Sequence, residues 1–438
     1  MTEMEKARMI KTMEYSTFKN KFLNLIRSRG ESQFEGLRES VQAILADIKQ
    51  NGDNAIIKFE EQFDNVQLSK NQIKVTNEEI KSAYSQVDSQ IIDALKQIIK
   101  NISAFHEAQK RDLWYIETRK GVSVGQIMRP IERIGVYIPG GKAPYPSTVL
   151  MTTVPAKIAG VKEIILCTPP RADGTVNPVI LIAAQEAGTT AIYKVGGVQA
   201  IGAMAYGTET IPPVNKIVGP GNKYVNTAKL LVSTSVGIDL PAGPSEVLIF
   251  ADDASNATLI AIDLIAQAEH DENVFCFLVT LSKTLADQVE KELKRLILNQ
   301  PRKQIIEQAL KENGFIITVS TIEQGIELIN EIAPEHLELQ IEDAETLLPQ
   351  ILNAGAIFLG KNSPVPVGDY AAGSNHVLPT GGSSKIYSGL SIFSFMKLID
   401  VIKCSTEGIQ TLLPWIEAIA QVEGLNAHIQ AVQMRVKK

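Results

Sequence analysis

The chain changes character at Arg133-Ile134-Gly135-Val136-Tyr137-Ile138, a short, mostly apolar run that is followed at once by Pro139-Gly140-Gly141-Lys142-Ala143-Pro144. An apolar run of this length without polar alternation is typical of a strand that is buried on both faces. Glycine and proline interrupt such a strand and favour a loop. We therefore expect a buried strand at residues 133–138, with a loop at its carboxyl end.

The alternation of strand and helix continues after this loop. Strands are expected at 163–167, 191–195 and 216–218, and helices at 178–187, 199–206 and 223–233. Apolar strands that alternate with helices every ~20–25 residues indicate βαβ units and a parallel sheet. Residues 129–245 are therefore predicted to form a doubly wound α/β domain.

A second set of the same kind lies further along the chain. Its strands are expected at 247–250, 274–280, 314–319 and 356–359, and its helices at 257–270, 284–298 and 322–332. These elements predict a second doubly wound α/β domain at residues 246–387. We expect residues 31–128, a helical block that ends in an extended or hairpin connector, to pack on this second domain. The remaining ends are predicted to be an N-terminal arm at residues 1–30 and a helical tail at 388–438 that is used between subunits.

The composition excludes several classes of protein. The 438 residues are 45% apolar, which allows a large core, and they carry a net charge of −6, which argues against nonspecific nucleic-acid binding. No apolar run approaches the ~18 residues of a membrane span, and the first residues do not resemble a secretory signal. Three widely spaced cysteines, Cys167, Cys276 and Cys404, give no disulfide framework and are expected to be buried. We expect a cytoplasmic protein with no nucleic-acid or membrane partner.

The five histidines are few enough to weigh singly. Gln267 and His270 lie three residues apart at the end of an expected helix and therefore share one face. An amide oxygen and an imidazole nitrogen that point to one place suit zinc. The alternative is a polar last turn of a helix, where histidine is favoured in any case. His106, in the middle of an expected helix, is interpreted as structural.

Glu335 and His336 follow Pro334 and are expected in the first turn of a helix. A helix N-terminus lowers the pKa of both groups, which favours a carboxylate and a neutral imidazole, the forms that act as bases. The alternative is a solvated helix start without a catalytic role.

The loop that contains Asp369 and His376 is short, polar and rich in glycine. Small residues let a backbone approach a ligand closely, and a carboxylate is a good zinc ligand, so this loop is predicted to belong to a site. Glu423 and His428 lie in the tail, where a surface role is the default.

Glycine-rich turns after strands, such as Gly219-Pro220-Gly221, are natural places for a phosphate or a dinucleotide. The full dinucleotide fingerprint GxGxxG is absent from this turn because the third glycine is missing. These residues alone predict a ligand at the carboxyl ends of the strands without identifying it.

Taken together, the motifs resemble those of the histidinol dehydrogenase family along nearly the whole chain. The resemblance is carried by residues 133–141, 195–197, 199–201, 217–222, 242–248, 267–270, 333–337, 368–370 and 375–380. It implies a fold of two incomplete Rossmann-like domains related to aldehyde dehydrogenases, with small N- and C-terminal pieces. It also implies a homodimer that oxidises L-histidinol to L-histidine with NAD and one zinc ion per subunit.

The resemblance assigns roles to individual residues. The zinc ligands would be Gln267, His270, Asp369 and, from the partner subunit, His428. The acid–base pair would be Glu335 and His336. The substrate would touch these residues together with Ser245, His376 and, from the partner subunit, Glu423. NAD would lie against Tyr137, Gln199 and Asn222. Val198 departs from the small residue that we expect beside Gln199.

Two other classes stay open from the residues alone. A zinc hydrolase could use the same ligands with Glu335 and His336 around an activated water. A non-catalytic protein that binds NAD would explain the glycine-rich turns but not the histidines in polar motifs. Absorbance at 340 nm with histidinol and NAD distinguishes the three. None of the cysteines lies in a motif, which favours a hydrated aldehyde over a cysteine thioester as the second intermediate.

Overall fold

A five-stranded parallel sheet forms the centre of the first α/β unit in the computed structural model, which describes residues 9–29, 36–140, 144–240 and 243–436. Its order is β6-β5-β4-β7-β8. The strands are β4 (Arg133–Tyr137), β5 (Glu163–Thr168), β6 (Ala191–Lys194), β7 (Lys216–Val218) and β8 (Gly237–Ile238). The expected strand at 133–138 is confirmed as β4, which lies between β5 and β7. Residues 141–143 of the expected loop, and Ala242, lie outside the described residues.

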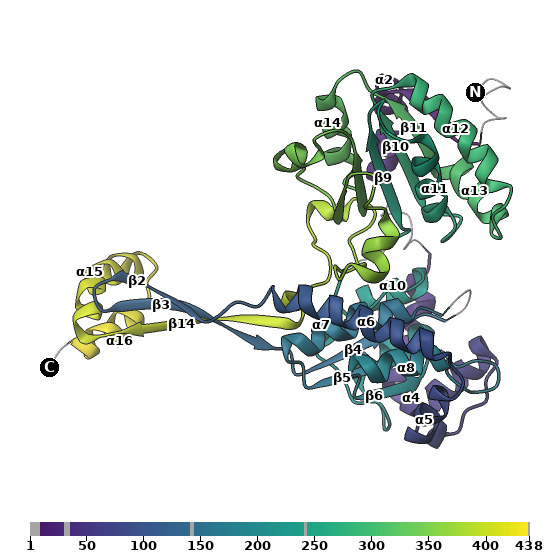
Figure 1. Ribbon diagram of the computed structural model, residues 1–438. Coiled ribbons are helices and arrows are strands. Elements are labelled where there is room, and N and C mark those ends of the chain that lie inside the picture. The colour runs from purple at the N-terminus through teal and green to yellow at the C-terminus, as the bar shows by residue number, and fades with distance from the viewer. Residues whose placement is uncertain (1–8, 30–35, 141–143, 241–242, 437–438) are drawn as a thin grey trace.

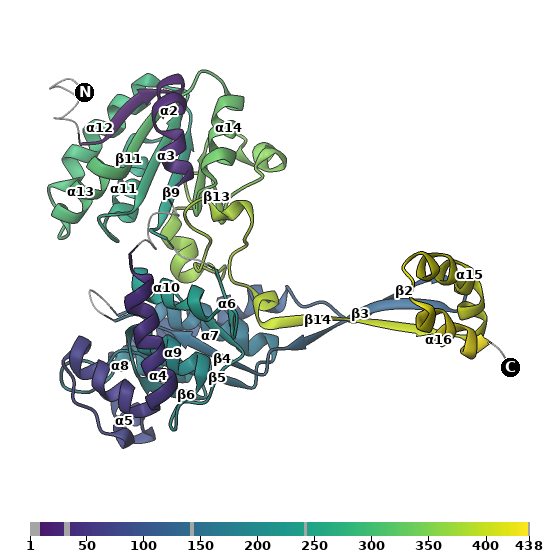
Figure 2. The same ribbon diagram turned by 180° about the vertical axis from the view of Figure 1, so that it is seen from behind.

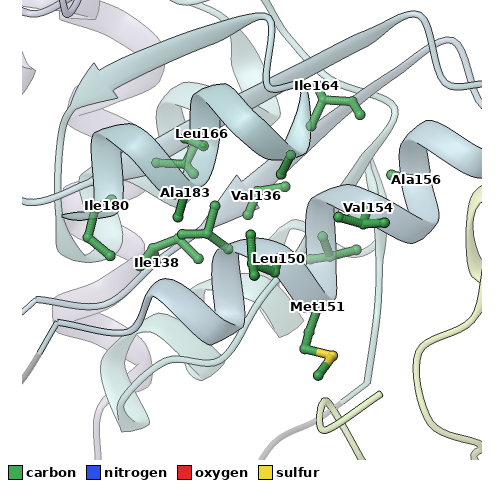
Figure 3. Packing of buried hydrophobic residues seen from close by; sticks show 14 of the residues in the cluster. Val136, Ile138, Leu150, Met151, Val154, Ala156, Ile164, Leu166, Ile180 and Ala183 are labelled. Carbon is green, nitrogen blue, oxygen red and sulfur yellow. The ribbon is translucent and has the colours of Figure 1, made fainter. Parts of the chain in front are cut away.

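Apolar helices cover both faces of this sheet. They are α7 (Pro146–Ala159), α8 (Pro178–Ala187), α9 (Gly197–Tyr206) and α10 (Lys223–Val232). Val136 faces one buried cluster with Leu150 and Val154 of α7, as Figure 3 shows, whereas Ile165 faces a second cluster on the other side. Because both faces are buried, the strands are continuously apolar, and this explains why they were visible in the sequence.

The helical block packs on this first sheet, so the prediction that it packs on the second is wrong. It consists of α4 (Arg38–Phe59), α5 (Asn77–Tyr84) and α6 (Ser89–Glu107). Val41 and Leu45 of α4 are buried in the same cluster as Ile201 of α9. Thr76 caps α5, because its side chain accepts a hydrogen bond from the Glu79 amide and the Glu79 carboxylate accepts one from the Thr76 amide. The long apolar faces of α4 and α6 dictate this packing.

A six-stranded parallel sheet in the order β1-β11-β10-β9-β12-β13 forms the second unit. Its strands are β1 (Lys11–Glu14), β9 (Glu246–Ala251), β10 (Phe275–Thr280), β11 (Gly314–Thr318), β12 (His336–Gln340) and β13 (Ala356–Leu359). Its helices are α11 (Ala257–Ala268), α12 (Lys283–Ile297), α13 (Lys303–Asn313) and α14 (Ile322–Ile332). The mixed α/β fold with two parallel sheets is as expected. No helix among the described residues combines the length and apolar character needed to cross a membrane.

The described part of the predicted N-terminal arm is built into this second unit. β1 pairs with β11, and α2 (Tyr15–Lys21) and α3 (Leu23–Arg27) follow it against the sheet (Figure 2). Phe18 is fully buried and packs edge-to-face against both Phe277 and Phe315. Residues 9–29 are therefore an edge of the sheet rather than a free arm.

A narrow projection extends away from both units (Figure 1). It consists of the antiparallel strands β2 (Trp114–Arg119), β3 (Val122–Pro130) and β14 (Met396–Cys404), with the helices α15 (Thr406–Val422) and α16 (Asn426–Val436). The predicted hairpin at β2 and β3 is confirmed. The prediction that residue 388 onward is helical is wrong for β14, because its apolar and β-branched residues pair with β3 along its whole length.

Candidate active site

The amino ends of β9 and β12 carry a buried pair of titratable side chains. Glu335 and His336 are 5% and 3% exposed, and they lie at the start of β12 between β9 and β13. The predicted helix at this point is therefore wrong. Pro334 follows Ala333, whose φ of 50° ends α14, and the chain enters the sheet directly.

Glu246, the first residue of β9, orients both side chains through its backbone. Its amide donates a hydrogen bond to Glu335 Oε2 at 2.8 Å, and its carbonyl oxygen lies 2.9 Å from His336 Nδ1. A carbonyl oxygen only accepts, so His336 Nδ1 carries a proton and Nε2 is the nitrogen that is available for proton exchange. Sequence reasoning missed Glu246, since no local motif connects it with residues 90 positions away.

Asp369 approaches this pair from η4 (Val367–Ala371). Its Oδ1 lies 3.3 Å from His336 Nε2, and its backbone oxygen accepts a hydrogen bond from His376 Nδ1 at 2.9 Å. His376 Nε2 lies 3.3 Å from the hydroxyl of Thr148 in the first unit. The glycine-rich loop predicted to belong to a site therefore meets Glu335 and His336.

Burial and neighbouring charges shift the pKa values of this cluster. Burial raises the pKa of Glu335. Burial alone lowers the pKa of His336, but Glu335 and Asp369 more than offset it, so the pKa of His336 is raised. Burial alone raises the pKa of Asp369, and His336, His376 and His270 together bring it below its usual value. A helix N-terminus was expected to lower the pKa of Glu335 and of His336. This expectation is wrong, because the two residues lie at the start of a strand and His336 lies beside the carboxylates of Glu335 and Asp369.

Gln267 and His270 lie where α11 ends, before β10. Gln267 is buried in the last turn, and His270 is two residues beyond the helix, with its amide donating to the Gln267 carbonyl oxygen at 3.2 Å. His270 reaches solvent, yet the protein atoms around it lower the pKa of its ring, and Asp369 acts in the opposite direction. Within the described ranges, no three His, Cys, Asp or Glu side chains are grouped so that they could hold a metal ion.

Glu423 and His428 lie on the projection and are both exposed. Figure 1 shows that the projection carries its helices far from the second sheet. One chain therefore brings together Glu335, His336, Asp369 and His376, with His270 beside them, but not Glu423 or His428. Ser245 directly precedes β9 at the same edge of the sheet.

A cavity of about 1010 Å³ lies at the carboxyl ends of the first sheet. Tyr137, Gln199 and Asn222 are among the residues that line it, together with Gly140, Pro169, Arg171, Gly197, Val198 and Tyr224. The Tyr137 hydroxyl accepts a hydrogen bond from the Gly197 amide at 3.1 Å, and Asn222 caps α10. A cavity therefore lies at the strand ends, where the sequence predicts a ligand.

Sequence reasoning also missed a carboxyl pair at this cavity, of which Asp64 lines the cavity and Glu60 is buried against the lining residue Gln199. Glu60 Oε1 accepts hydrogen bonds from Gln199 Nε2 and from the Gly196 amide, both at 2.9 Å. Burial raises the pKa of Glu60 to about 8, and that of neighbouring Asp64, which lines the cavity, is also raised by burial. These residues come from the helical block, which was assigned to the other unit.

The cysteines lie outside both sites. Cys167 and Cys276 are buried, and burial raises the pKa of each thiol. Cys404 is exposed at the end of β14, so the expectation that all three are buried is wrong for it.

Comparison with known proteins assigns the chain to a family. A family profile described as histidinol dehydrogenase matches residues 27–436. The chain is 48% identical over 409 residues to a histidinol dehydrogenase from Methanosarcina mazei, covering 93% of this chain and 94% of that protein. This chain belongs to the histidinol dehydrogenase family.

Further members of the histidinol dehydrogenase family agree in sequence and in structure. The protein from Bacillus thuringiensis is 46% identical over 413 residues, covering 94% of this chain and 96% of that protein. The crystal structure of histidinol dehydrogenase from Elizabethkingia anophelis superposes with a TM-score of 0.93 at 42% identity, covering 98% of each chain. The projection and both α/β units therefore belong to the family fold.

Proposed function

We propose that this protein is a zinc-dependent enzyme that oxidises L-histidinol through L-histidinal to L-histidine, reducing one NAD in each of two steps. The observation that carries the proposal is the buried cluster of Glu335, His336 and Asp369 in a member of this family. The cavity at the first sheet has the size of a ligand site and lies at the strand ends where dinucleotides bind.

The first step removes two hydrogens from the alcohol. In its neutral form, His336 takes the hydroxyl proton on Nε2 while the carbon-bound hydrogen leaves as hydride to the nicotinamide, giving an aldehyde and NADH. The hydrogen bond from His336 Nδ1 to Glu246 fixes the ring, so that Nε2 faces Asp369. General-base assistance of this kind contributes roughly 10²–10⁴-fold to a rate.

The second step adds water to the aldehyde. Glu335, in its carboxylate form, takes a proton from the water, whose oxygen attacks the carbonyl carbon, and the former carbonyl oxygen takes up a proton. The resulting hydrate gives its carbon-bound hydrogen as hydride to a second NAD and loses its two hydroxyl protons. The product is the carboxylate of histidine. No cysteine lies in the cluster among the described residues, and the two buried thiols have raised pKa values, which supports a hydrate over a thioester.

The donor set at the second sheet fits zinc in its chemistry. Gln267, His270 and Asp369 would hold it with amide, imidazole and carboxylate donors, and His428 of the partner subunit would complete the set. When bound, zinc would orient the imidazole and amine of the substrate. Ser245, His376 and Glu423 of the partner subunit would contact the same molecule.

The proposed homodimer explains why the projection leaves the body of the chain. Its surface exposes large apolar side chains, among them Trp114, Ile116, Ile402, Trp415 and Val422. An apolar surface of this kind marks a protein interface. A second copy that covers it would carry Glu423 and His428 to the incomplete edge of the first.

The test is the yield of NADH per histidinol consumed, followed at 340 nm with zinc-loaded protein. Two NADH per substrate support the full proposal. One NADH with release of aldehyde contradicts the second step, and none contradicts the oxidation itself.

A further inference from the structure

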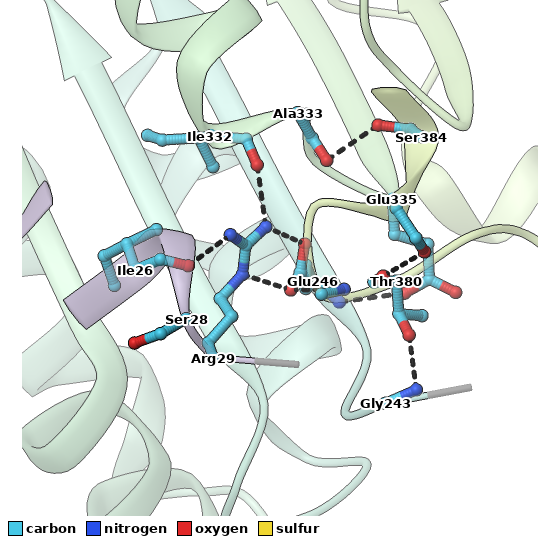
Figure 4. A network of polar contacts seen from close by, with 12 residues as sticks. Ile26, Ser28, Arg29, Gly243, Glu246, Ile332, Ala333, Glu335, Thr380 and Ser384 are labelled. Carbon is cyan, nitrogen blue, oxygen red and sulfur yellow. Dashed lines mark hydrogen bonds and ion pairs between the residues drawn. The ribbon is translucent and has the colours of Figure 1, made fainter. Parts of the chain in front are cut away.

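Arg29 and Glu246 form a buried ion pair close to Glu335 (Figure 4). Arg29 Nε lies 2.5 Å from Glu246 Oε1 and Nη2 lies 2.7 Å from Oε2, so the guanidinium binds the carboxylate with both arms of its fork. The two side chains are 2% and 0% exposed. Removing two charges from water offsets most of their attraction, so stability alone does not account for such a pair.

Glu246 connects this ion pair to the reacting groups. Its amide nitrogen holds Glu335 Oε2 at 2.8 Å and its carbonyl oxygen holds His336 Nδ1 at 2.9 Å. Both contacts come from the backbone of one residue. Any shift of residue 246 therefore moves the carboxylate and the imidazole together.

Arg29 also fixes the turn that delivers Glu335. Its Nη1 donates to the Ile26 carbonyl oxygen at 2.6 Å and its Nη2 to the Ile332 carbonyl oxygen at 2.8 Å. Ile332 is followed by Ala333, whose φ of 50° is in the left-handed region that L residues other than glycine rarely adopt. One guanidinium thus ties α3, the end of α14 and the start of β9 at the point where the chain turns into β12.

The Glu246 carboxylate has a further partner. Its Oε1 accepts a hydrogen bond from the Gly381 amide at 3.0 Å, and the hydroxyl of neighbouring Thr380 accepts one from the Gly243 amide at 2.5 Å. The segment that follows the His376 loop is therefore anchored to the same carboxylate.

We propose that Arg29 and Glu246 are positioning residues for the Glu335–His336 pair, acting through the backbone amide and carbonyl of Glu246. The inference rests on the proposed acid–base role of that pair. Neither Arg29 nor the Glu246 carboxylate contacts the reacting atoms in this arrangement. Their contribution is to fix the orientation of the Glu335 carboxylate through Oε2 and of the His336 ring through Nδ1.

The decisive variant is the double substitution Arg29→Met/Glu246→Leu. Replacing a buried ion pair by apolar residues of similar volume commonly preserves stability, whereas removing one partner leaves an uncompensated charge. We expect the double variant to unfold thermally close to the wild type. Its kcat should fall roughly 10–100-fold, because small displacements of reacting groups have effects of this size. The KM for histidinol and for NAD should stay within about twofold, since the ground-state contacts are unchanged.

Two single variants bracket this result. Arg29→Lys keeps the charge but cannot bind the carboxylate in a bidentate way, so its kcat should lie between those of the wild type and the double variant. Arg27→Met is the matched control, because Arg27 joins α3 to Glu331 of α14 without touching Glu246. Its kcat should equal that of the wild type.

A stable double variant with the kcat of the wild type would overturn the inference and leave the pair with a structural role alone. If the double variant does not fold, Arg29→Lys and Glu246→Gln decide instead. A lower kcat at unchanged KM supports the positioning role, and an unchanged kcat overturns it. The wild type is measured alongside. Failure of the wild type to produce NADH from histidinol would refute the proposed function, not the positioning role.

Discussion

The two parallel sheets present their sites at opposite ends of their strands. In the first sheet, the residues that line the cavity follow the strands, as Tyr137 ends β4 and Asn222 comes after β7. In the second sheet, the titratable cluster precedes the strands, with His336 at the start of β12 and His270 before β10. The cavity of the first sheet therefore lies where the rule for parallel sheets places a ligand, at the carboxyl ends of the strands, whereas the cluster of the second sheet lies at the opposite end.

Helix direction explains why the two ends suit different ligands. Helices that cross over a parallel sheet run against its strands, so their N-termini lie at the carboxyl edge and their C-termini at the amino edge. The starts of α9 and α10 at the cavity carry partial positive charge, which favours phosphates. The end of α11 beside His270 carries partial negative charge, which favours a metal cation or an amine. Changes at the amino edge should therefore affect turnover, and changes at the carboxyl edge should affect NAD binding.

The largest effect is expected from Glu335→Gln at the amino edge. The amide keeps the shape of the side chain but cannot take a proton from water, so oxidation of the aldehyde should fall by about 10²–10⁴-fold. Stopped-flow assays with histidinal as substrate measure this half of the reaction. Glu342→Gln, at an exposed position just after β12, serves as the control. Normal histidinal oxidation by the Glu335 variant would refute its role.

His270→Asn should lower zinc affinity by at least about 100-fold, because even residues behind a ligand contribute 10–100-fold. Metal content after dialysis, measured by atomic absorption, gives the result.

His428→Asn should show the same loss. If the sites are shared between subunits, mixing the two variants restores part of the activity, because one site of each mixed dimer regains all four donors. One zinc per chain and full activity in the His270 variant would exclude it as a ligand.

A smaller and different effect is expected at the carboxyl edge. Gln199→Ala removes one hydrogen-bonding group from the cavity wall, which should raise the KM for NAD by up to about 10-fold. The kcat at saturating NAD should stay near that of the wild type. Initial rates over a range of NAD concentrations separate the two parameters. A lower kcat with an unchanged KM for NAD would contradict the assignment of separate tasks to the two edges.

The smallest effect concerns stability and is set by Glu60. Its pKa is raised from 4.5 to about 8, so between these values the folded protein holds a proton that the unfolded chain has lost. Stability from this group is therefore present at low pH and falls as pH rises through this window. Glu60→Gln mimics the protonated form and should gain in Tm relative to the wild type as pH increases from 5 to 8. Exposed Glu61→Gln should show no such trend, and a constant difference for Glu60→Gln would refute the shift.

The sequence predicts elements that follow one simple pattern. β4, β5 and β9 are buried on both faces and continuously apolar, so their positions were correct to within a residue or two. β12 was missed because Glu338 and Gln340, although polar, are fully enclosed. Glu338 is held by the Val365 amide and by Gln340, which also reaches Asp263, and these partners are remote in sequence.

Site residues were predictable in kind but not in arrangement. His376, Asp369 and His336 come from unusual polar motifs, and the fold brings them together. Arg29, Glu60 and Glu246 have no such local signal, because their partners lie more than a hundred residues away or arise from the backbone of the sheet. Local patterns do not record contacts of this kind.

The pairing of β14 with β3 has a consequence for synthesis. Pro130 pairs with Met396, so the ribosome adds 266 residues after Pro130 to reach the first residue of the third strand. At typical translation rates this takes on the order of tens of seconds. During that time β3 presents an open edge that can pair with other chains. Nascent chains of this protein should therefore need chaperone protection late in translation, when nearly all of both α/β units has already been made.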